Sequence, residues 1–245
     1  MSERHHFLID PQRITRDTFF LNGSEGHHLR NVVRLGEMDE IYLLDRKGKA
    51  YRSIIENVES TEITGRVVEV IQDYNSPSVK LHLAIGLLKG SKIDEVAKRT
   101  TELGVTSITP LLMQHSVKKS LNRERIMRVI ESAQKQSGRG RAPDINDTVD
   151  FDEWCSAVPH QYSAYADQSP EAVPLNRWLE STSETEDLWL LIGPEGGFHE
   201  DEISSMKEYE IPAVSLGQAR LRSETAAIAA SAVILEFHHA RRSDV

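Results

Sequence analysis

Hydrophobic and polar residues alternate with a period of two in several stretches of the first 75 residues, and this pattern predicts β-strands. The turn residues Asp45–Lys49 separate two of these stretches and predict a hairpin. One helix is expected over residues 25–35, with Ser24 as its N-cap. The expected strands are FFLNG at 19–23, DEIYLLD at 39–45, YRSIIENV at 51–58 and TEITGRVVEVI at 61–71.

After a turn-rich segment at 73–78, strands and helices alternate. This order predicts an α/β domain with a mostly parallel sheet covered on both faces, so we expect a small β-rich domain over 1–75 and an α/β domain over 76–245. The strands are expected at 79–87, 107–113, 161–167, 188–194 and 211–217. The helices are expected at 91–104, 122–138, 199–210 and 223–242, with a capping box of Ser91 and Asp94, a cap at Asn122 and stops at Gly104 and Gly138.

Composition limits the class of protein. Cys155 is the one cysteine, which excludes an internal disulfide. No apolar run is long enough to span a bilayer, and the first residues lack the apolar core of a signal peptide, so a cytoplasmic location is expected. No cysteine or histidine cluster has zinc spacing, so no metal is expected.

The charge is unevenly distributed along the chain. The net charge is −9, yet residues 76–145 carry 13 basic and 6 acidic side chains, whereas residues 146–245 carry 6 and 19. The basic excess is typical of a solvated helical surface or of a surface that contacts nucleic acid, and the residues alone leave both readings open.

Two predicted strands end in unusual loops: IGPEGGF at 192–198 and SLGQARLRSETAA at 215–227. Ligands bind at the carboxyl ends of parallel strands, where glycines let the backbone approach them closely. The loops contain neither a P-loop nor a dinucleotide-binding fingerprint, and Glu195 disfavours a polyphosphate. The residues therefore predict a ligand pocket in the α/β domain, with a basic segment in the same domain.

Six motifs together resemble one family. IGPEGGF and LGxxxLRxETA at 216–226 resemble the SPOUT-type RNA methyltransferases, and more narrowly the family that methylates N3 of one uridine in bacterial 16S ribosomal RNA. The other motifs are HHLRNVVRLG at 27–36, KGSKIDEVAKRTTELGV at 89–105, ITPLLMQHS at 108–116 and AQKQSGRGRAP at 133–143. The resemblance implies an N-terminal PUA-like barrel for RNA, a C-terminal α/β domain tied in a trefoil knot, S-adenosyl-L-methionine as methyl donor, a homodimer, and 16S ribosomal RNA within the small subunit as substrate.

The resemblance also implies site residues. The donor would be bound by Leu191, Ile192, Gly193, Pro194, Gly196, Gly197, Leu216, Gly217, Leu221 and Thr225. RNA would be bound by Arg30, Arg34, Gln136, Arg139 and Arg141, in a strip that Lys118, Lys119, Arg123 and Arg128 would extend.

The chemistry expected at this site is attack by a uracil nitrogen. N3 becomes nucleophilic once deprotonated, so a cation is needed to stabilise the anion, and Arg222 is the first choice. Glu224 would orient Arg222 or accept the proton, or would simply favour the start of a helix. Glu195 is either a turn residue or a catalytic group.

Two departures from the family pattern leave other functions open. Ala219 stands where the family usually has an arginine, with Arg220 following it, and Lys135 replaces a usual carboxylate. The alternatives are an RNA-binding assembly factor without catalysis, which donor binding would exclude, and a ribose 2′-O-methyltransferase, which nucleoside analysis would distinguish.

Overall fold

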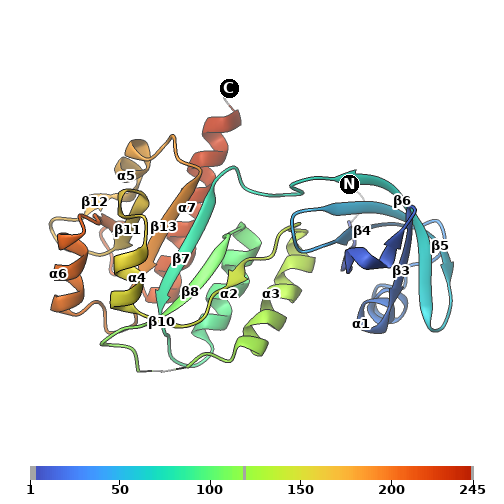
Figure 1. Ribbon diagram of the computed structural model, residues 1–245, viewed down its shortest axis with the longest axis horizontal. Coiled ribbons are helices and arrows are strands. Elements are labelled where there is room, and N and C mark those ends of the chain that lie inside the picture. The colour runs from blue at the N-terminus through green and yellow to red at the C-terminus, as the bar shows by residue number, and fades with distance from the viewer. Residues whose placement is uncertain (1–3, 118–119, 244–245) are drawn as a thin grey trace. The chain divides into compact units, whose positions relative to one another are not determined.

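The computed structural model describes residues 4–117 and 120–243, so Lys118 and Lys119 lie outside it (Figure 1). The chain forms two compact units. The first comprises Met1–Ser76 with Ser132–Ala142, and the second comprises Pro77–Glu131 with Pro143–Val245. The sequence interpretation assigned residues 132–142 to the second domain, whereas the structure groups them with the first unit.

The first unit is built on a six-stranded mixed sheet with the order β1-β4-β5-β6-β3-β2. β1 pairs with β4 in parallel and the other pairs are antiparallel, which gives a half-barrel with β1 and β2 at its edges. The expected strands and the hairpin at Asp45–Lys49 are confirmed. The strands are β1 (His6–Leu8), β2 (Ile14–Thr15), β3 (Thr18–Asn22), β4 (Glu40–Leu44), β5 (Ala50–Val58) and β6 (Glu62–Ile71), with a short 3-10 helix at Pro11–Arg13.

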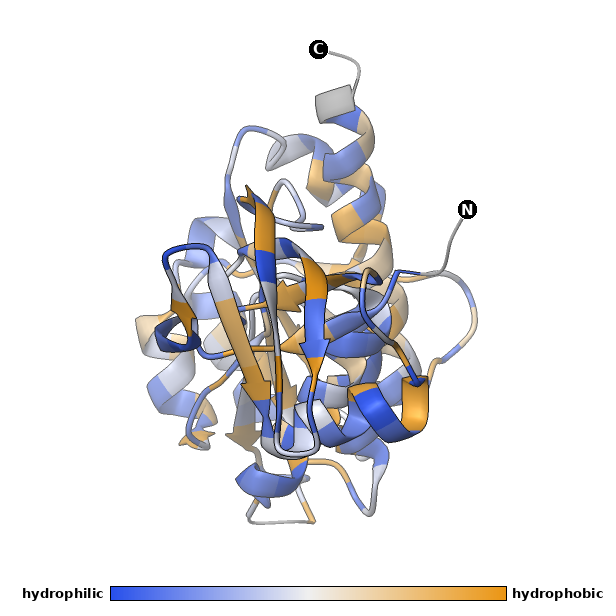
Figure 2. Ribbon diagram, turned by 90° about the vertical axis from the view of Figure 1, so that its right-hand side faces the viewer, coloured by the Kyte–Doolittle hydropathy of each residue, from blue (hydrophilic) through white to orange (hydrophobic). Residues whose placement is uncertain are grey.

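The core of this unit follows from the alternation of its strands. Hydrophobic and hydrophilic bands interchange along them in Figure 2. The buried positions form a larger cluster, in which Phe19 and Ile55 are fully inaccessible, and a smaller one around Leu44 and Ala50. At Gly65 a Cβ atom would lie 2.2 Å from the carbonyl oxygen of Ile54 and 2.6 Å from the Phe19 ring, so the close strand packing requires glycine.

The expected helix after β3 is present but differs in detail. It starts as α1 (Gly23–His27) after Asn22, so Ser24 is not its N-cap. It continues as a π-helical segment, His28–Val33, and ends at Arg34 in a left-handed conformation with φ of 63°. Arg30 and Arg34 would share one face of an α-helix at their i, i+4 spacing. The π-helical turn has a different spacing and Arg34 lies beyond its end, so this alignment is absent.

The second unit contains a fully parallel sheet with the order β10-β8-β7-β13-β11-β14-β12, with β9 also paired to β8. The predicted fold class is confirmed, and the trefoil knot stays a prediction. The strands are β7 (Lys80–Gly86), β8 (Ser107–Leu112), β9 (Asp144–Ile145), β10 (Val149–Asp150), β11 (Ser163–Ala166), β12 (Val173–Pro174), β13 (Asp187–Ile192) and β14 (Ala213–Ser215).

Helices pack against this sheet, and α3 contributes residues to both units (Figure 1). They are α2 (Lys92–Leu103), α3 (Arg123–Ser137), α4 (Phe151–Ala157), α5 (Leu175–Ser181), α6 (Glu200–Glu208) and α7 (Ser223–Ser243), with a 3-10 turn at His160–Tyr162. α4 and α5 were not predicted, because seven residues are too few to establish a helical period.

The predicted helix ends were mostly correct. Gly104 and Gly138 adopt left-handed conformations with φ of 103° and 68°, and the side chain of Asn122 accepts a hydrogen bond from the backbone of Arg125 at 3.0 Å. The capping box of α2 was wrong, because the side chain of Ser91 makes no capping hydrogen bond.

Candidate active site

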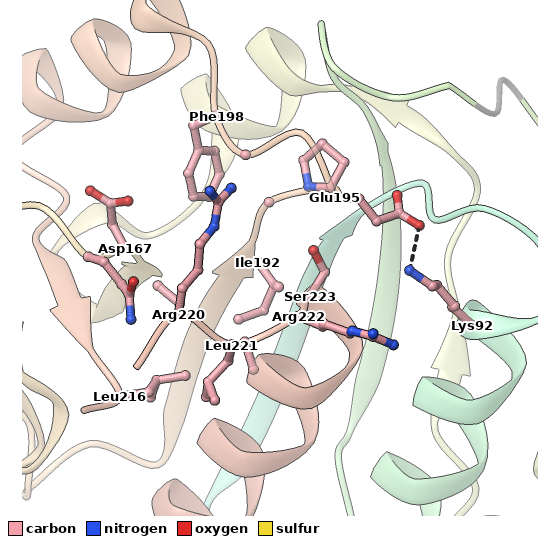
Figure 3. A pocket seen from close by; sticks show the side chains of 16 residues that line it. Lys92, Asp167, Ile192, Glu195, Phe198, Leu216, Arg220, Leu221, Arg222 and Ser223 are labelled. Carbon is pink, nitrogen blue, oxygen red and sulfur yellow. Dashed lines mark hydrogen bonds and ion pairs between the residues drawn. The ribbon is translucent and has the colours of Figure 1, made fainter. Parts of the chain in front are cut away.

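Three neighbouring strands of the parallel sheet end beside one cavity of about 620 Å³ (Figure 3). β13 ends at Ile192, β11 at Ala166 and β14 at Ser215, and all three point the same way, so the loops that follow them meet at one edge. The wall consists of Lys92, Ala166, Asp167, Gln168, Ile192, Gly193, Pro194, Glu195, Gly197, Phe198, Leu216, Arg220, Leu221, Arg222, Ser223 and Ala226.

The glycines of the first loop have separate structural reasons. A Cβ atom at Gly193 would lie 3.2 Å from the Phe198 ring, which packs over the backbone there. Gly197 has φ of 77°, a conformation that other residues rarely adopt. At Gly196 a Cβ atom would lie 2.8 Å from Cβ of His115. The loop therefore presents bare backbone to the cavity at Gly193 and Gly197, while Gly196 allows close packing against His115.

The helix after this loop is anchored by a buried carboxylate. Glu202 is 3% exposed, and its two oxygens accept hydrogen bonds from the backbone N–H groups of His199 and Gln114, both at 2.8 Å. The first bond belongs to a capping box at the start of α6, with His199 as N-cap. The second ties the helix to the segment after β8, so the first loop is fixed at its C-terminal end.

Glu195 lines the cavity and forms an ion pair. Its Oε1 accepts hydrogen bonds from the backbone N–H of Lys89 at 3.0 Å and from Nζ of Lys92 at 3.1 Å (Figure 3). Burial acts to raise its pKa, but the hydrogen bonds from the Lys89 backbone and its own backbone, together with the Lys92 ammonium, outweigh burial and lower the pKa. Glu195 is thus held ionised as an anchor.

Lys92 was not among the predicted site residues. It lies at the first position of α2, and Nζ also lies 3.6 Å from Oε2 of Glu224, in the first turn of α7. The KGSKIDEVAKRTTELGV motif contained the residue, but a sequence pattern carries no information about which distant loop a lysine reaches.

The structure brings most of the predicted pocket residues together. Ile192, Gly193, Pro194, Gly197, Leu216, Leu221 and Arg222 all line the cavity. The predicted residues outside its wall are Leu191, Gly196, Gly217, Glu224 and Thr225.

Gly196 packs against His115, and the other four lie as follows. Leu191 belongs to the buried cluster on the opposite face of the sheet from Ile192, because successive side chains of a strand alternate. Gly217 and Thr225 are exposed. The Glu224 side chain is 12% exposed, and its Oε2 is buried without a hydrogen-bond partner in the chain.

Two arginines of the second loop line the cavity from different directions. Arg222 extends towards Lys92, whereas Arg220 extends towards Asp167 and Phe198 (Figure 3). Asp167 and Phe198 were missed by the sequence analysis. Asp167 directly follows β11, and the rule that ligands bind where parallel strands end could have identified it.

The predicted RNA-binding residues in 132–142 have unequal roles. The Arg139 side chain donates to the backbone oxygen of Asn75, and burial lowers its pKa, so it is a structural anchor of the first unit. Arg141 is exposed and its guanidinium lies over Gly48, 3.7 Å from an added Cβ. Gln136 is exposed. Gln134, two residues earlier, is fully buried, and the sequence analysis did not identify it as a structural residue.

Gln134 closes the loop that follows α3. Its Nε2 donates to the backbone oxygens of Arg139 at 2.9 Å and Gly140 at 3.2 Å. A helical period alone could have placed Gln134 on the buried side of α3, since Ile130 and Ala133 share that side.

Of the remaining predicted RNA-binding residues that the structure describes, Arg30 lies within the π-helical segment and Arg34 directly follows it. Arg30 donates to the backbone oxygen of Glu59 at 2.5 Å, and Arg34 is exposed. Within the described ranges 4–117 and 120–243, no helix is long and apolar enough to cross a membrane, and no cluster of His, Cys, Asp or Glu could hold a metal ion.

Comparison with known proteins defines the class. Residues 75–235 match the model of an RNA methyltransferase domain and residues 21–68 match that of an RNA methyltransferase PUA domain. The fold and the cavity are therefore those of an RNA methyltransferase with a PUA domain.

Relatives narrow this class. The ribosomal RNA small subunit methyltransferase E of Synechocystis is 30% identical to the chain, over 94% of this chain and 77% of the relative. That of Bacillus subtilis is 28% identical, over 95% of each chain. The crystal structure of a ribosomal RNA small subunit methyltransferase E from Neisseria gonorrhoeae bound to S-adenosyl methionine is 26% identical, with a TM-score of 0.85, 96% of this chain and 98% of that chain being covered. The chain belongs to the ribosomal RNA small subunit methyltransferase E family.

Proposed function

We propose that this protein transfers a methyl group from S-adenosyl-L-methionine to N3 of one uridine in bacterial 16S ribosomal RNA. The observation that carries this proposal is the meeting of two glycine-containing strand exits at one cavity, in a chain of this family. Under this proposal the methyl donor binds and the methyl transfer takes place in this one cavity.

The residues of the cavity fit this donor. Its volume of about 620 Å³ lies within the range of small-molecule sites, roughly 300–1,000 Å³. Ile192, Leu216 and Leu221 offer an apolar surface suited to a flat base, and the backbone at Gly193 and Gly197 can reach polar edges without interference from a Cβ atom.

The chain would assist the reaction through charge and position. The bound donor supplies an electrophilic methyl group on a sulfonium. Arg222 lines the cavity and extends towards Lys92 (Figure 3), where its guanidinium can stabilise the negative charge that develops on uracil oxygens as N3 loses its proton. Glu195 and Glu224 both contact Lys92, and these contacts support anchoring rather than proton transfer.

RNA would be recognised by the first unit. A PUA domain and the exposed Arg141 support this assignment, because arginine binds phosphates through two parallel hydrogen bonds. The natural substrate would be the RNA within the small ribosomal subunit, in the cytoplasm.

A homodimer is also proposed, on the basis of the family resemblance. The alanines of α7 that could permit close helix approach are partly used within the chain, since Ala227 and Ala230 are fully buried and α7 packs against α2. Val233 remains 47% exposed on the same helix. Light scattering at micromolar concentration checks this, and a monomer would contradict it.

The function is tested by incubating the protein with labelled S-adenosyl-L-methionine and unmodified small ribosomal subunits, followed by nucleoside analysis. We expect 3-methyluridine. A 2′-O-methylated nucleoside would indicate the ribose enzyme instead, and RNA binding without donor binding would indicate an assembly factor.

A further inference from the structure

Lys92 occupies a position that is locally unfavourable for a cation. It is the first residue of α2, where the exposed N–H groups of the helix favour negative charge. Asp94 and Glu95 in the same turn satisfy that preference. A lysine at this position therefore needs a compensating interaction from outside the helix.

That interaction comes from two carboxylates on two different loops. Lys92 Nζ lies 3.1 Å from Oε1 of Glu195, in the loop after β13, and 3.6 Å from Oε2 of Glu224, at the start of α7. One ammonium group thus connects α2, the first strand exit and the helix that follows the second exit.

The two carboxylates are partly withdrawn from water. The side chains of Glu195 and Glu224 are 23% and 12% exposed, and Oε2 of Glu224 has no hydrogen-bond partner in the chain. An ionised carboxylate in such a place is costly without a nearby positive charge. Lys92 supplies that charge to both.

We propose that Lys92 is a positioning residue that holds the two strand exits in the arrangement that binds the methyl donor. Lys92 itself lines the cavity, so a change in its ion pairs alters the wall directly. The inference rests on the proposed function, because its main measurement uses S-adenosyl-L-methionine as the probe.

The test compares Lys92→Met, which keeps the length of the side chain and removes the charge, with Lys92→Arg and with Lys98→Met as a matched control on the same helix. Calorimetry with S-adenosyl-L-methionine should show at least about tenfold weaker binding for Lys92→Met. Lys92→Arg should stay within about threefold of the parent, and Lys98→Met should be unchanged.

A double variant separates positioning from a general loss of structure. Without the ammonium, the carboxylates of Glu195 and Glu224 repel each other with no positive charge between them. Removing one of the two charges relieves this repulsion, so Lys92→Met/Glu195→Gln should bind the donor more tightly than Lys92→Met.

A second measurement needs no donor. The backbone N–H of Lys89 donates to Glu195, so its hydrogen exchange should accelerate in Lys92→Met and not in Lys98→Met. Parent affinity in Lys92→Met, or a weakened affinity that Glu195→Gln does not improve, would overturn the positioning role. Failure of the parent to bind S-adenosyl-L-methionine would instead refute the proposed function. Hydrogen exchange at Lys89 would still test whether Lys92 holds Glu195 in place.

Discussion

Pro194 lies directly against Gly86. A Cβ atom at Gly86 would be 2.6 Å from Cδ and 2.7 Å from the backbone nitrogen of Pro194. Gly86 is the last residue of β7, so the missing side chain of one strand leaves room for the loop that follows its neighbour, β13. The shape of the first strand exit thus depends on a residue more than a hundred positions earlier in the chain.

Gly86→Ala should displace this loop. We expect a loss of about 1–3 kcal/mol in the free energy of unfolding, as is typical of overpacking, together with weaker binding of S-adenosyl-L-methionine. Urea denaturation and calorimetry measure the two effects. Gly36→Ala is the control, because an added Cβ there has open space; equal behaviour of both variants would contradict the role of Gly86.

Arg222→Ala should slow single-turnover methyl transfer by roughly a hundredfold or more, the loss typical of removing a preorganised charge. Donor affinity should change little, and the rate should recover partly at higher pH, where N3 loses its proton without help. Arg222→Lys should retain partial activity, because it keeps the charge but loses the planar guanidinium.

Arg220→Ala provides the comparison for this prediction, since Arg220 lines the same cavity but extends towards Asp167 (Figure 3). If Arg220→Ala slows transfer and Arg222→Ala does not, the stabilising charge belongs to the other side of the cavity.

Arg141→Glu should weaken RNA binding without unfolding the first unit. Arg141 is exposed, and each lost phosphate contact reduces the salt dependence of binding, so the slope against the logarithm of salt concentration should fall by about one or more. Filter binding at several salt concentrations measures this, with the exposed Arg177→Glu on α5 as control.

Arg139→Glu should behave differently. Its guanidinium anchors the loop to Asn75, so the variant should lower the melting temperature as well as RNA binding. A folded, fully stable Arg139→Glu protein would show that the anchor contributes nothing.

The stability of the first unit should decrease on mild acidification because of His6. Burial, followed by the charge of Arg4, lowers the pKa of His6, whose Nε2 lies 3.2 Å from the hydroxyl of Tyr74. The unfolded chain therefore binds a proton first as the pH falls below the ordinary histidine value of about 6.5. The contribution of His6 is complete above that value and is lost as the pH falls towards the lowered pKa of the folded state.

Urea unfolding of the parent and of His6→Gln between about pH 7.5 and pH 5 checks this. The difference between the two proteins should shrink as the pH falls. A constant difference would mean that His6 acts only through packing.

The sequence predicted the long elements because their residues repeat with a clear period. Ile93, Val96 and Ala97 recur at helical spacing on the buried side of α2, and β13 coincides with one apolar run. The two loops of the cavity were found because glycines and charged residues follow buried strands there.

The parts that were missed depend on contacts between residues far apart in sequence. Lys92 meets Glu195 and Glu224 only after the sheet has formed, and no local pattern encodes that meeting. The grouping of residues 132–142 with the first unit depends similarly on the hydrogen bond of 2.9 Å that Asn75 Nδ2 donates to the backbone oxygen of Gly138, and on the Lys135–Glu25 ion pair of 2.7 Å.

Because the first unit is discontinuous in sequence, it cannot be completed early in synthesis. Its sheet is encoded within the first 76 residues, but the segment that completes the unit ends at Ala142. During translation the N-terminal strands are made before the segment that packs against them. Glu25 has no Lys135 to pair with, and the unit is incomplete until some sixty-six further residues have been added. A nascent chain stalled just after Ser76 should consequently be more sensitive to protease than one stalled well beyond Ala142, once the ribosomal tunnel has released the whole segment.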